Sequence, residues 1–432
     1  MKVLSLFKVL LILLAGLSIK GCSASISSPL GNQENTADYI SRYMVSNQLP
    51  APETINSIQL YRKGDTNNPP IIELGSAQKL ILAFDELTDI SGQFRITFTH
   101  YDQNWDESNI PQDWFLEGLN EIILGEGTKN QSSPPSYFHY RTEFPNNQLR
   151  FATSGNFMLH VSDFSSGVRL FSLPFFVTEN AGEMTSWIET DYNAGPRFEA
   201  RDRPFSNFTY PEFIDFPQFD LSFYFVQNRF WGDARKTENY DFSEKGHTQF
   251  YLSGENAFPA NFDFIGLNLE TFSVDGHQII DWIPGENPPE IILREDILNF
   301  TSNPLTAWGS TFGNPKTSAE ARYANIRFRF QDGGAFTSKQ GVYLVGDFNQ
   351  WIISEKNKLE YNQNSGYWET SALIKQGTYT YKYAIKDGTD IDDLILSDYI
   401  TRRNQEYVSF VYFNDPEYRY QRLIHIQVFR SD

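Results

Sequence analysis

The side chains that most often carry out chemistry in proteins are sparse and scattered along this chain. The six histidines are His100, His139, His160, His247, His277 and His425. No two of them stand at the short spacing that a zinc site uses, and the single cysteine, Cys22, excludes sites built from several thiolates. The sequence contains no Gly-x-Ser-x-Gly elbow, phosphate-binding Gly-rich loop or dinucleotide fingerprint. It therefore predicts no catalytic centre, no metal site and no cofactor.

Carboxylates are abundant, but their spacing is not that of a known site. Four aspartates cluster between positions 387 and 393, where the order of an EF-hand is missing and a solvated acidic turn is the simpler interpretation. Asp102, Asp106 and Glu107 resemble a glycosidase pair only as far as any neighbouring acids do in a chain with 54 of them. His100 and Asp102 lie two residues apart, a spacing that suits a structural hydrogen bond as well as catalysis. These patterns favour a protein that is not an enzyme.

Composition and charge exclude two further classes of protein. The formal net charge of −19 repels phosphate backbones, which argues against binding to nucleic acid. The aromatic content of 16% argues against general disorder. Aromatic side chains next to Thr, Val and Ile fit the pleated surface of a sheet and therefore indicate β-structure.

The N-terminus has the features of an export signal followed by a lipid-attachment site. Residues 1–21 combine an early lysine with an apolar run, and the run is too short for a membrane-spanning helix. Ile19-Lys20-Gly21-Cys22 resembles a bacterial lipobox, which makes Cys22 the predicted lipid acceptor; the alternative is an ordinary signal peptide with an incidental cysteine. Cleavage before Cys22 removes three lysines and no acids, so the net charge of −19 becomes −22.

The rest of the chain predicts an all-β protein of tandem immunoglobulin-like, early-set β-sandwiches. Short apolar runs such as 57–62, 94–100 and 156–161 alternate with turns rich in Gly, Asn, Ser and Pro. The predicted organisation is a signal peptide (1–21), a lipidated tether (22–51), an N-terminal β-sandwich (52–182), a middle β-rich domain (183–305), a linker (306–321) and a C-terminal early-set-like β-sandwich (322–432).

A ten-residue segment of the third block suggests a second possible function. Val342 to Trp351, with its Gly-Asp-Phe-Asn-x-Trp turn, resembles the opening of glycogen- and starch-binding modules of the early-set type. The residues themselves suit a turn, because Gly346 permits a positive φ and Asp347 and Asn349 can cap it. The alternative function is therefore a lipid-anchored protein that binds α-glucans.

Short motifs recur in a fixed order along the chain. They are His100 with Trp105 and Ser108, the segment 116–120, His139 with Tyr140, Gly155 with Asn156, Gln227 with Asn228, Asn256 with Phe258, and Gly377 with Tyr379 and Tyr381. In this order they resemble the plug proteins of the type IX secretion system. The sequence departs from the family pattern at Asn104, Ala257 and Pro259, and near Arg229, where the arginine is displaced.

The resemblance implies a role that needs no catalysis. Such a protein would close the periplasmic end of the large outer-membrane β-barrel translocon, its implied partner, with the motif residues serving as structural or partner-facing positions. A lipid on Cys22 would hold it in the periplasm at the inner leaflet of the outer membrane, and this anchor would be its only attachment to the membrane.

Overall fold

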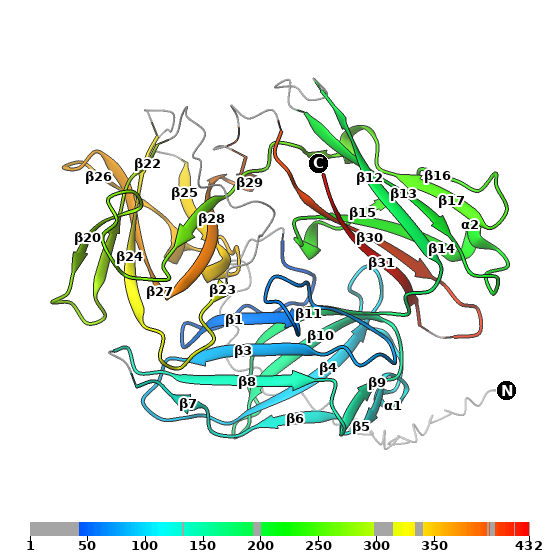
Figure 1. Ribbon diagram of the computed structural model, residues 1–432, viewed down its shortest axis with the longest axis horizontal. Coiled ribbons are helices and arrows are strands. Elements are labelled where there is room, and N and C mark those ends of the chain that lie inside the picture. Colours follow the sequence, from blue (N-terminus) through cyan, green and yellow to red (C-terminus); the bar gives the residue numbers. More distant parts are fainter. Residues whose placement is uncertain are drawn as a thin grey trace, which may run out of the picture. The chain divides into compact units, whose positions relative to one another are not determined.

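The computed structural model describes residues 43–131, 134–192, 200–297, 314–332, 340–394, 397, 402–418 and 420–431. The predicted signal peptide and Cys22 lie outside these residues. The described chain is almost entirely β-structure in several sheets, which confirms the predicted fold class (Figure 1). Its two α-helices, α1 (Gln112–Phe115) and α2 (Pro217–Asp220), have four residues each. No helix in the described part of the chain is long and apolar enough to cross a bilayer.

The first sandwich contains two main sheets and a small two-stranded one. The first sheet has the order β1 (Ile55–Arg62), β3 (Leu80–Glu86), β8 (Phe138–Phe144) and β7 (Thr128–Lys129). The second has the order β2 (Ile71–Glu73), β11 (Arg169–Thr178), β10 (Gly155–Asp163), β4 (Phe94–Tyr101) and β6 (Glu121–Leu124), and β5 (Leu116–Gly118) pairs with β9 (Leu149–Phe151).

The core of this first sandwich follows from the alternation of side chains along its strands. In β4, residues of even number from Phe94 to Phe98 are buried and the odd-numbered residues between them are only partly buried, as expected for a strand with one face on the core. Phe84 packs edge-to-face on Phe171, and Phe144 packs edge-to-face on Phe175, so rings from both sheets meet in the middle. The strands expected at 57–62, 94–100 and 156–161 are confirmed.

The second sandwich also contains two sheets, with α2 at one end. One sheet has the order β12 (Glu183–Asp191), β13 (Arg201–Thr209), β17 (His247–Tyr251) and β16 (Tyr240–Asp241), with β18 (Phe258–Pro259) on β13. The other has the order β15 (Arg235–Thr237), β14 (Leu221–Gln227), β30 (Glu406–Phe413) and β31 (Arg422–Arg430). Two single turns of 3-10 helix, η2 (Trp231–Asp233) and η3 (Gly254–Asn256), complete it.

The third sandwich takes strands from both sides of the predicted linker. One sheet contains β19 (Ile265–Asn268), β28 (Gly377–Asp387), β23 (Asn314–Pro315), β25 (Gly341–Gly346) and β29 (Asp390–Asp392). The other contains β20 (Ile279–Ile283), β21 (Glu290–Leu293), β22 (Asp296–Ile297), β24 (Tyr323–Gln331), β27 (Tyr367–Lys375) and β26 (Glu360–Asn362). The 3-10 turns η4 (Asp347–Asn349) and η5 (Glu355–Asn357) follow β25.

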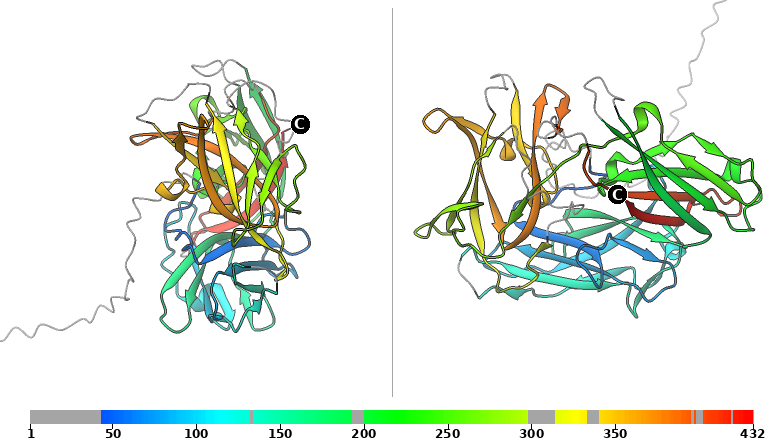
Figure 2. Two further views of the ribbon diagram at one scale, coloured as in Figure 1. Left: turned by 90° about the vertical axis from the view of Figure 1, so that its left-hand side faces the viewer. Right: turned by 45° about the horizontal axis from the view of Figure 1, so that its top comes forward.

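Strand pairing therefore crosses the predicted boundaries between the middle and C-terminal blocks. β30, from the predicted C-terminal domain, pairs with β14 over seven residues, and Figures 1 and 2 show the red C-terminal strands among the green ones. In the opposite sense, β21 of the predicted middle domain pairs with β24. From this pairing we infer that the second sandwich is built from two separate stretches, 183–259 and 406–430, with most of the third sandwich inserted between them.

Two further apolar clusters lie between the sandwiches. In one, Trp105 and Phe176 of the first sandwich meet Tyr224, Trp231 and Phe410 of the second. In the other, aromatic residues of the second and third sandwiches gather around the turn after β25: Phe230, Phe262, Phe264 and Trp351, with Tyr43 against them. The segment 262–264 is an irregular stretch, and the rings of Phe262 and Phe264 fill this cluster.

Candidate functional site

The first group of motif residues surrounds His100 at the end of β4, and we call it the His100 joint. His100 is buried, and its Nε2–H donates to the carbonyl oxygen of Ser154 at 3.0 Å. Since a carbonyl only accepts, Nδ1 must accept from the Ser108 hydroxyl, 2.8 Å away. Gly155 lies directly against the imidazole, because a Cβ added there would stand 2.2 Å from Nε2. The motif spacing from His100 to Ser108 thus closes one hairpin-like loop.

The same loop attaches the first sandwich to the second. Asn156 donates from Nδ2 to the carbonyl oxygen of Asp102 at 2.9 Å and accepts from the Tyr412 hydroxyl at 2.8 Å. The Tyr224 hydroxyl of β14 donates to Asn104 Oδ1 at 3.0 Å. Trp105 has a positive φ of 63° and packs edge-to-face on Phe176 within the shared apolar cluster. These family residues therefore form a buried contact between sandwiches.

Burial of His100 has a consequence for stability that depends on pH. Desolvation lowers the pKa of His100 to about 4, and its hydrogen bond to the Ser154 carbonyl only partly opposes this. Between pH 6.5 and pH 4 the unfolded chain therefore binds a proton that the folded chain does not bind. The free energy of unfolding falls as pH decreases through this window.

A His100→Gln variant is expected to lose this pH dependence. From pH 7.5 to pH 5 the wild type should lose about 2 kcal/mol at this group, because one pKa unit corresponds to about 1.4 kcal/mol. The stability gap between wild type and variant should therefore shrink by that amount in urea unfolding at the two pH values. His247→Gln, which changes an exposed histidine, is the control. A gap that stays constant with pH would contradict the assignment of a neutral, buried His100.

The second group of motif residues surrounds Glu406 at the start of β30. Glu406 is buried and accepts from Arg229, with Arg229 Nη2 and Glu406 Oε2 3.1 Å apart and Nε bonded to Oε1. Arg430 Nη2 reaches the same Oε2 at 3.2 Å. Next to this pair, Asn228 donates to Gln405 at 2.6 Å and Gln227 donates to the Tyr407 hydroxyl at 3.1 Å. These bonds hold β14 and β30 together although the two strands are far apart in sequence.

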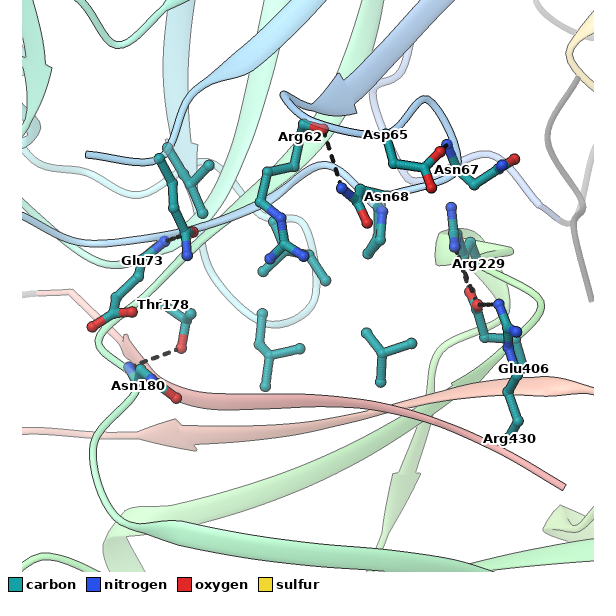
Figure 3. A pocket seen from close by; sticks show the side chains of 16 residues that line it. Arg62, Asp65, Asn67, Asn68, Glu73, Thr178, Asn180, Arg229, Glu406 and Arg430 are labelled. Atoms are coloured by element: carbon teal, nitrogen blue, oxygen red, sulfur yellow. Dashed lines mark hydrogen bonds and ion pairs between the residues drawn. The ribbon is translucent and has the colours of Figure 1, made fainter. Parts of the chain in front are cut away.

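A cavity of about 440 Å³ opens beside this cluster, between the first and second sandwiches (Figure 3). Its wall includes Arg62 at the end of β1, Glu73 on β2, and Arg229, Glu406 and Arg430 on the opposite side. Glu406 is buried and paired with two guanidinium groups, Arg229 and Arg430, an arrangement that suits a structural role better than proton transfer.

A third buried polar group surrounds Asp85 and includes one motif residue, His139; we call this group the Asp85 lock. Asp85 on β3 and Lys375 on β27 are both fully buried, and Nζ lies 2.7 Å from Oδ2. The Tyr323 hydroxyl donates to the same Oδ2 at 2.7 Å, and His139 Nδ1 lies 2.7 Å from Oδ1. The ammonium of Lys375 also faces the Tyr137 ring, 4.7 Å from its centre. Burial lowers the pKa of Lys375, and the charge of Asp85 opposes that shift. The lock joins the first sandwich to the third.

The remaining motif residues also serve packing and turns. Tyr140 donates to Glu86 at 2.9 Å within the first sandwich. Phe258 is buried beneath the Arg235 guanidinium, while Asn256 contributes its backbone carbonyl to the same arginine. In β28, a Cβ on Gly377 would stand 2.5 Å from the Asn314 carbonyl oxygen.

The tyrosines of the same strand bind other strands through their hydroxyls. Tyr379 donates to the Lys375 carbonyl, and Tyr381 donates to Asp296 on β22, each at 2.7 Å. Burial and the charge of Asp296 raise the pKa of Tyr381, so its hydroxyl stays protonated and can donate.

The segment that resembles glycan-binding modules is an internal turn. Asp347 accepts from the Thr380 backbone N–H at 2.6 Å and from the Trp351 indole at 3.2 Å. Trp351 is buried among Phe230 and Phe264 and offers no open ring face to a sugar. Gly346 is extended, with a φ of −175°, so the expectation of a positive φ at this turn is wrong.

Sequence reasoning missed the charged centres of two of these groups and one exposed feature. Asp85 and Lys375 are 290 positions apart, so no local pattern pairs them. The exposed feature is a set of aromatic side chains around α2. The sequence pattern that could have indicated it is a phenylalanine at every third position, in a segment rich in acids and proline: Phe213, Phe216 and Phe219.

Comparison with known proteins agrees with the motif order. Residues 55–179 match the model of the type 9 secretion system plug protein 1st domain. No curated protein matches the sequence. Among solved structures, a hypothetical protein from Parabacteroides merdae ATCC 43184 is similar with a TM-score of 0.78 and 19% identity, over 89% of this chain and 99% of that one, which shows a shared fold.

A second solved structure is similar too weakly to indicate a shared fold. It is the Pseudomonas fluorescens alkylpurine DNA glycosylase AlkC, with a TM-score of 0.18 and 17% identity over 29% of this chain and 30% of that one.

The domain that matches the plug-protein model, residues 55–179, contains the His100 joint and two residues of the Asp85 lock, Asp85 and His139. Residues 55–179 therefore form a first domain of the type IX secretion plug kind.

Proposed function

We propose that this protein is a non-enzymatic plug that closes the periplasmic end of the outer-membrane β-barrel translocon of type IX secretion. The family gives the chain a role in type IX secretion. The observation that carries the finer proposal is that the motif residues interlock the sandwiches. Beside His100, Asn156 of the first sandwich accepts from Tyr412 of the second, and Asp85 of the first sandwich pairs with Lys375 of the third.

Such interlocking suits a part that must block a pore. A wide barrel leaks unless its mouth is covered, and a cover that deforms easily would leave gaps. Buried ion pairs and shared apolar clusters oppose relative movement of the sandwiches. Separating two sandwiches would break the ion pairs and expose apolar rings to water, and both changes cost free energy. A braced body can dock and leave with little internal rearrangement.

The proposed anchor raises the local concentration of the plug near its partner. A lipid on Cys22 would confine the protein to the inner face of the outer membrane, where the translocon opens. Confinement to one membrane raises the effective concentration of the plug at the translocon, so occupancy increases without any new contact. An interface of moderate affinity could therefore hold the plug in place and still release it. The net charge left after cleavage, −22, would keep the body from adhering to anionic lipids.

Purification of the tagged, full-length protein from its native host tests this function. Mild detergent extraction is expected to recover a very large outer-membrane β-barrel protein in near-stoichiometric amount. Loss of the gene should make cells more permeable to large polar antibiotics such as vancomycin, since an uncovered pore admits them. The control is an unrelated tagged lipoprotein of the same membrane. Recovery of no barrel protein, together with unchanged permeability, would refute the proposal.

A further inference from the structure

A group of exposed aromatic side chains projects from one end of the second sandwich. This aromatic tip consists of Phe213, Phe216, Phe219 and Tyr418, whose side chains are 49%, 61%, 77% and 50% exposed. The three phenylalanines lie in the segment between β13 and β14 that contains α2, and Tyr418 lies in the turn between β30 and β31 (Figure 1). The tip lies outside the motif residues and outside the joints.

The fold holds these rings outward. Ile214 and Pro217, which alternate with the exposed phenylalanines, are buried and fix the segment on the sandwich. Backbone N–H groups of Phe219 and Asp220 donate to the Phe216 carbonyl at 2.9 and 3.0 Å, which closes the turn. The tip is therefore preorganised, and binding through it would cost little conformational entropy.

One arginine connects the two segments of the tip. The Arg422 guanidinium lies 4.9 Å from the centre of the Phe213 ring and 5.7 Å from that of Tyr418. It also pairs with Glu179 and Asp415, each at 2.6 Å. With its charge satisfied within the fold, Arg422 positions the rings and leaves their outer faces open to a partner.

Exposure of this kind is unfavourable in water unless a partner covers it. Each large aromatic side chain carries on the order of 150–250 Å² of surface, and apolar surface gains roughly 25 cal/mol per Å² when removed from water. Contiguous exposed rings on a rigid turn are typical of interaction hot spots.

Charges around the tip define the kind of surface that it fits. Glu212, Asp215 and Glu417 are exposed acids that are close in sequence to these rings. Asp220 lies close enough to Asp215 and Asp415 for their charges to affect its pKa. Burial raises the pKa of Asp220, as do the negative charges of Asp415 and Asp215. An acidic rim repels anionic lipid headgroups and a second copy of this acidic chain. It attracts an apolar surface bordered by lysine and arginine.

We propose that the aromatic tip docks into an apolar, basic-edged surface on the periplasmic mouth of the translocon barrel. This inference rests on the proposed function and specifies which part of the plug makes contact. The rings supply the affinity by leaving water, and the acidic rim guides approach and orientation. Binding should therefore weaken as salt rises from 50 to 500 mM, because exposed charges are screened within a few ångströms at high salt.

The test compares two full-length variants in barrel pull-downs from the native host. The tip variant carries Phe213→Ser, Phe216→Ser and Phe219→Ser. The control variant carries Tyr192→Ser, Trp282→Ser and Tyr361→Ser, which remove aromatic side chains that are 58%, 41% and 50% exposed elsewhere. The tip variant is expected to recover at least tenfold less barrel than the control and the wild type. Phe219→Ser alone, at the most exposed position, provides a second variant if the triple variant is poorly folded.

The outcomes separate this inference from the proposed function. If wild type, control and tip variants all recover the barrel equally, the tip is not the contact and the plug function stands. If the wild type recovers no barrel, both fail. Sedimentation of the purified wild type should show a monomer, and a dimer that the tip substitutions abolish would overturn the inference in favour of a second copy.

Discussion

Replacing Asp85 with Asn is expected to lower the free energy of unfolding by about 3–5 kcal/mol, the usual effect of removing one partner of a buried ion pair. Lys375 would remain fully buried with its ammonium facing the Tyr137 ring and without the carboxylate that now lies 2.7 Å away. Its pKa, already lowered by burial, would fall further without the opposing charge of Asp85. Unfolding in urea, followed by tryptophan fluorescence, measures the loss.

A double substitution separates the pair from its surroundings. Asp85→Asn combined with Lys375→Met is expected to be less destabilising than the sum of the single variants, because no buried charge is then left alone. The matched control is Glu143→Gln, which breaks a surface pair with Lys63 at 2.8 Å and should cost less than about 1 kcal/mol. Equal losses for Asp85→Asn and Glu143→Gln would mean that the lock contributes nothing beyond an ordinary surface pair.

Replacing Gly155 with Ala is expected to destabilise the first sandwich by about 4 kcal/mol, from overpacking and backbone strain together. The added Cβ would stand 2.2 Å from His100 Nε2 and within 3.0 Å of two further ring atoms. The ring cannot retreat, since both of its nitrogens are hydrogen-bonded. The glycine also has a φ of +148°, which L-residues rarely adopt. Thermal unfolding should show a lower midpoint.

Gly167→Ala is the control that isolates the steric part of this effect. Gly167 also has a positive φ, +71°, but a Cβ there would have nothing within 4 Å. Only the backbone cost remains, about 1 kcal/mol. A similar loss for both variants would show that contact with His100 is unimportant. A larger loss for Gly155→Ala would confirm that the His100 ring requires a glycine at this position.

These two predictions bear on what the family resemblance means. The motif residues that lie together in space do so at joints, where they are mostly buried, whereas the aromatic tip carries no motif at all. Ordered motifs thus identified the family through the residues that assemble the body. Residues that would meet a partner have no local constraint of this kind and leave a weaker pattern in a single sequence.

The sequence by itself determined the fold class, the family and much of the first sandwich. Aromatic and β-branched residues at a period of two, divided by turn residues, specify strands because each strand has one buried face. In this sandwich, consecutive strands such as β10 and β11 pair directly across a short turn, so local order and spatial order agree. Gly155 was visible in the sequence as a motif residue, whereas its contact with the His100 ring follows only from the structure.

Only the tertiary structure decided how the later strands are shared between sandwiches. The sequence pattern shows that β30 is a buried strand. It does not show that β30 pairs with β14, a strand about 180 positions earlier in the chain. The same holds for Asp85 and Lys375, and for Trp351, whose burial depends on rings from the second sandwich. The physical reason is that hydrogen-bonding edges and apolar faces are generic along a chain. Which two of them meet depends on the shape and charge of both partners at once, and no local stretch of sequence contains both.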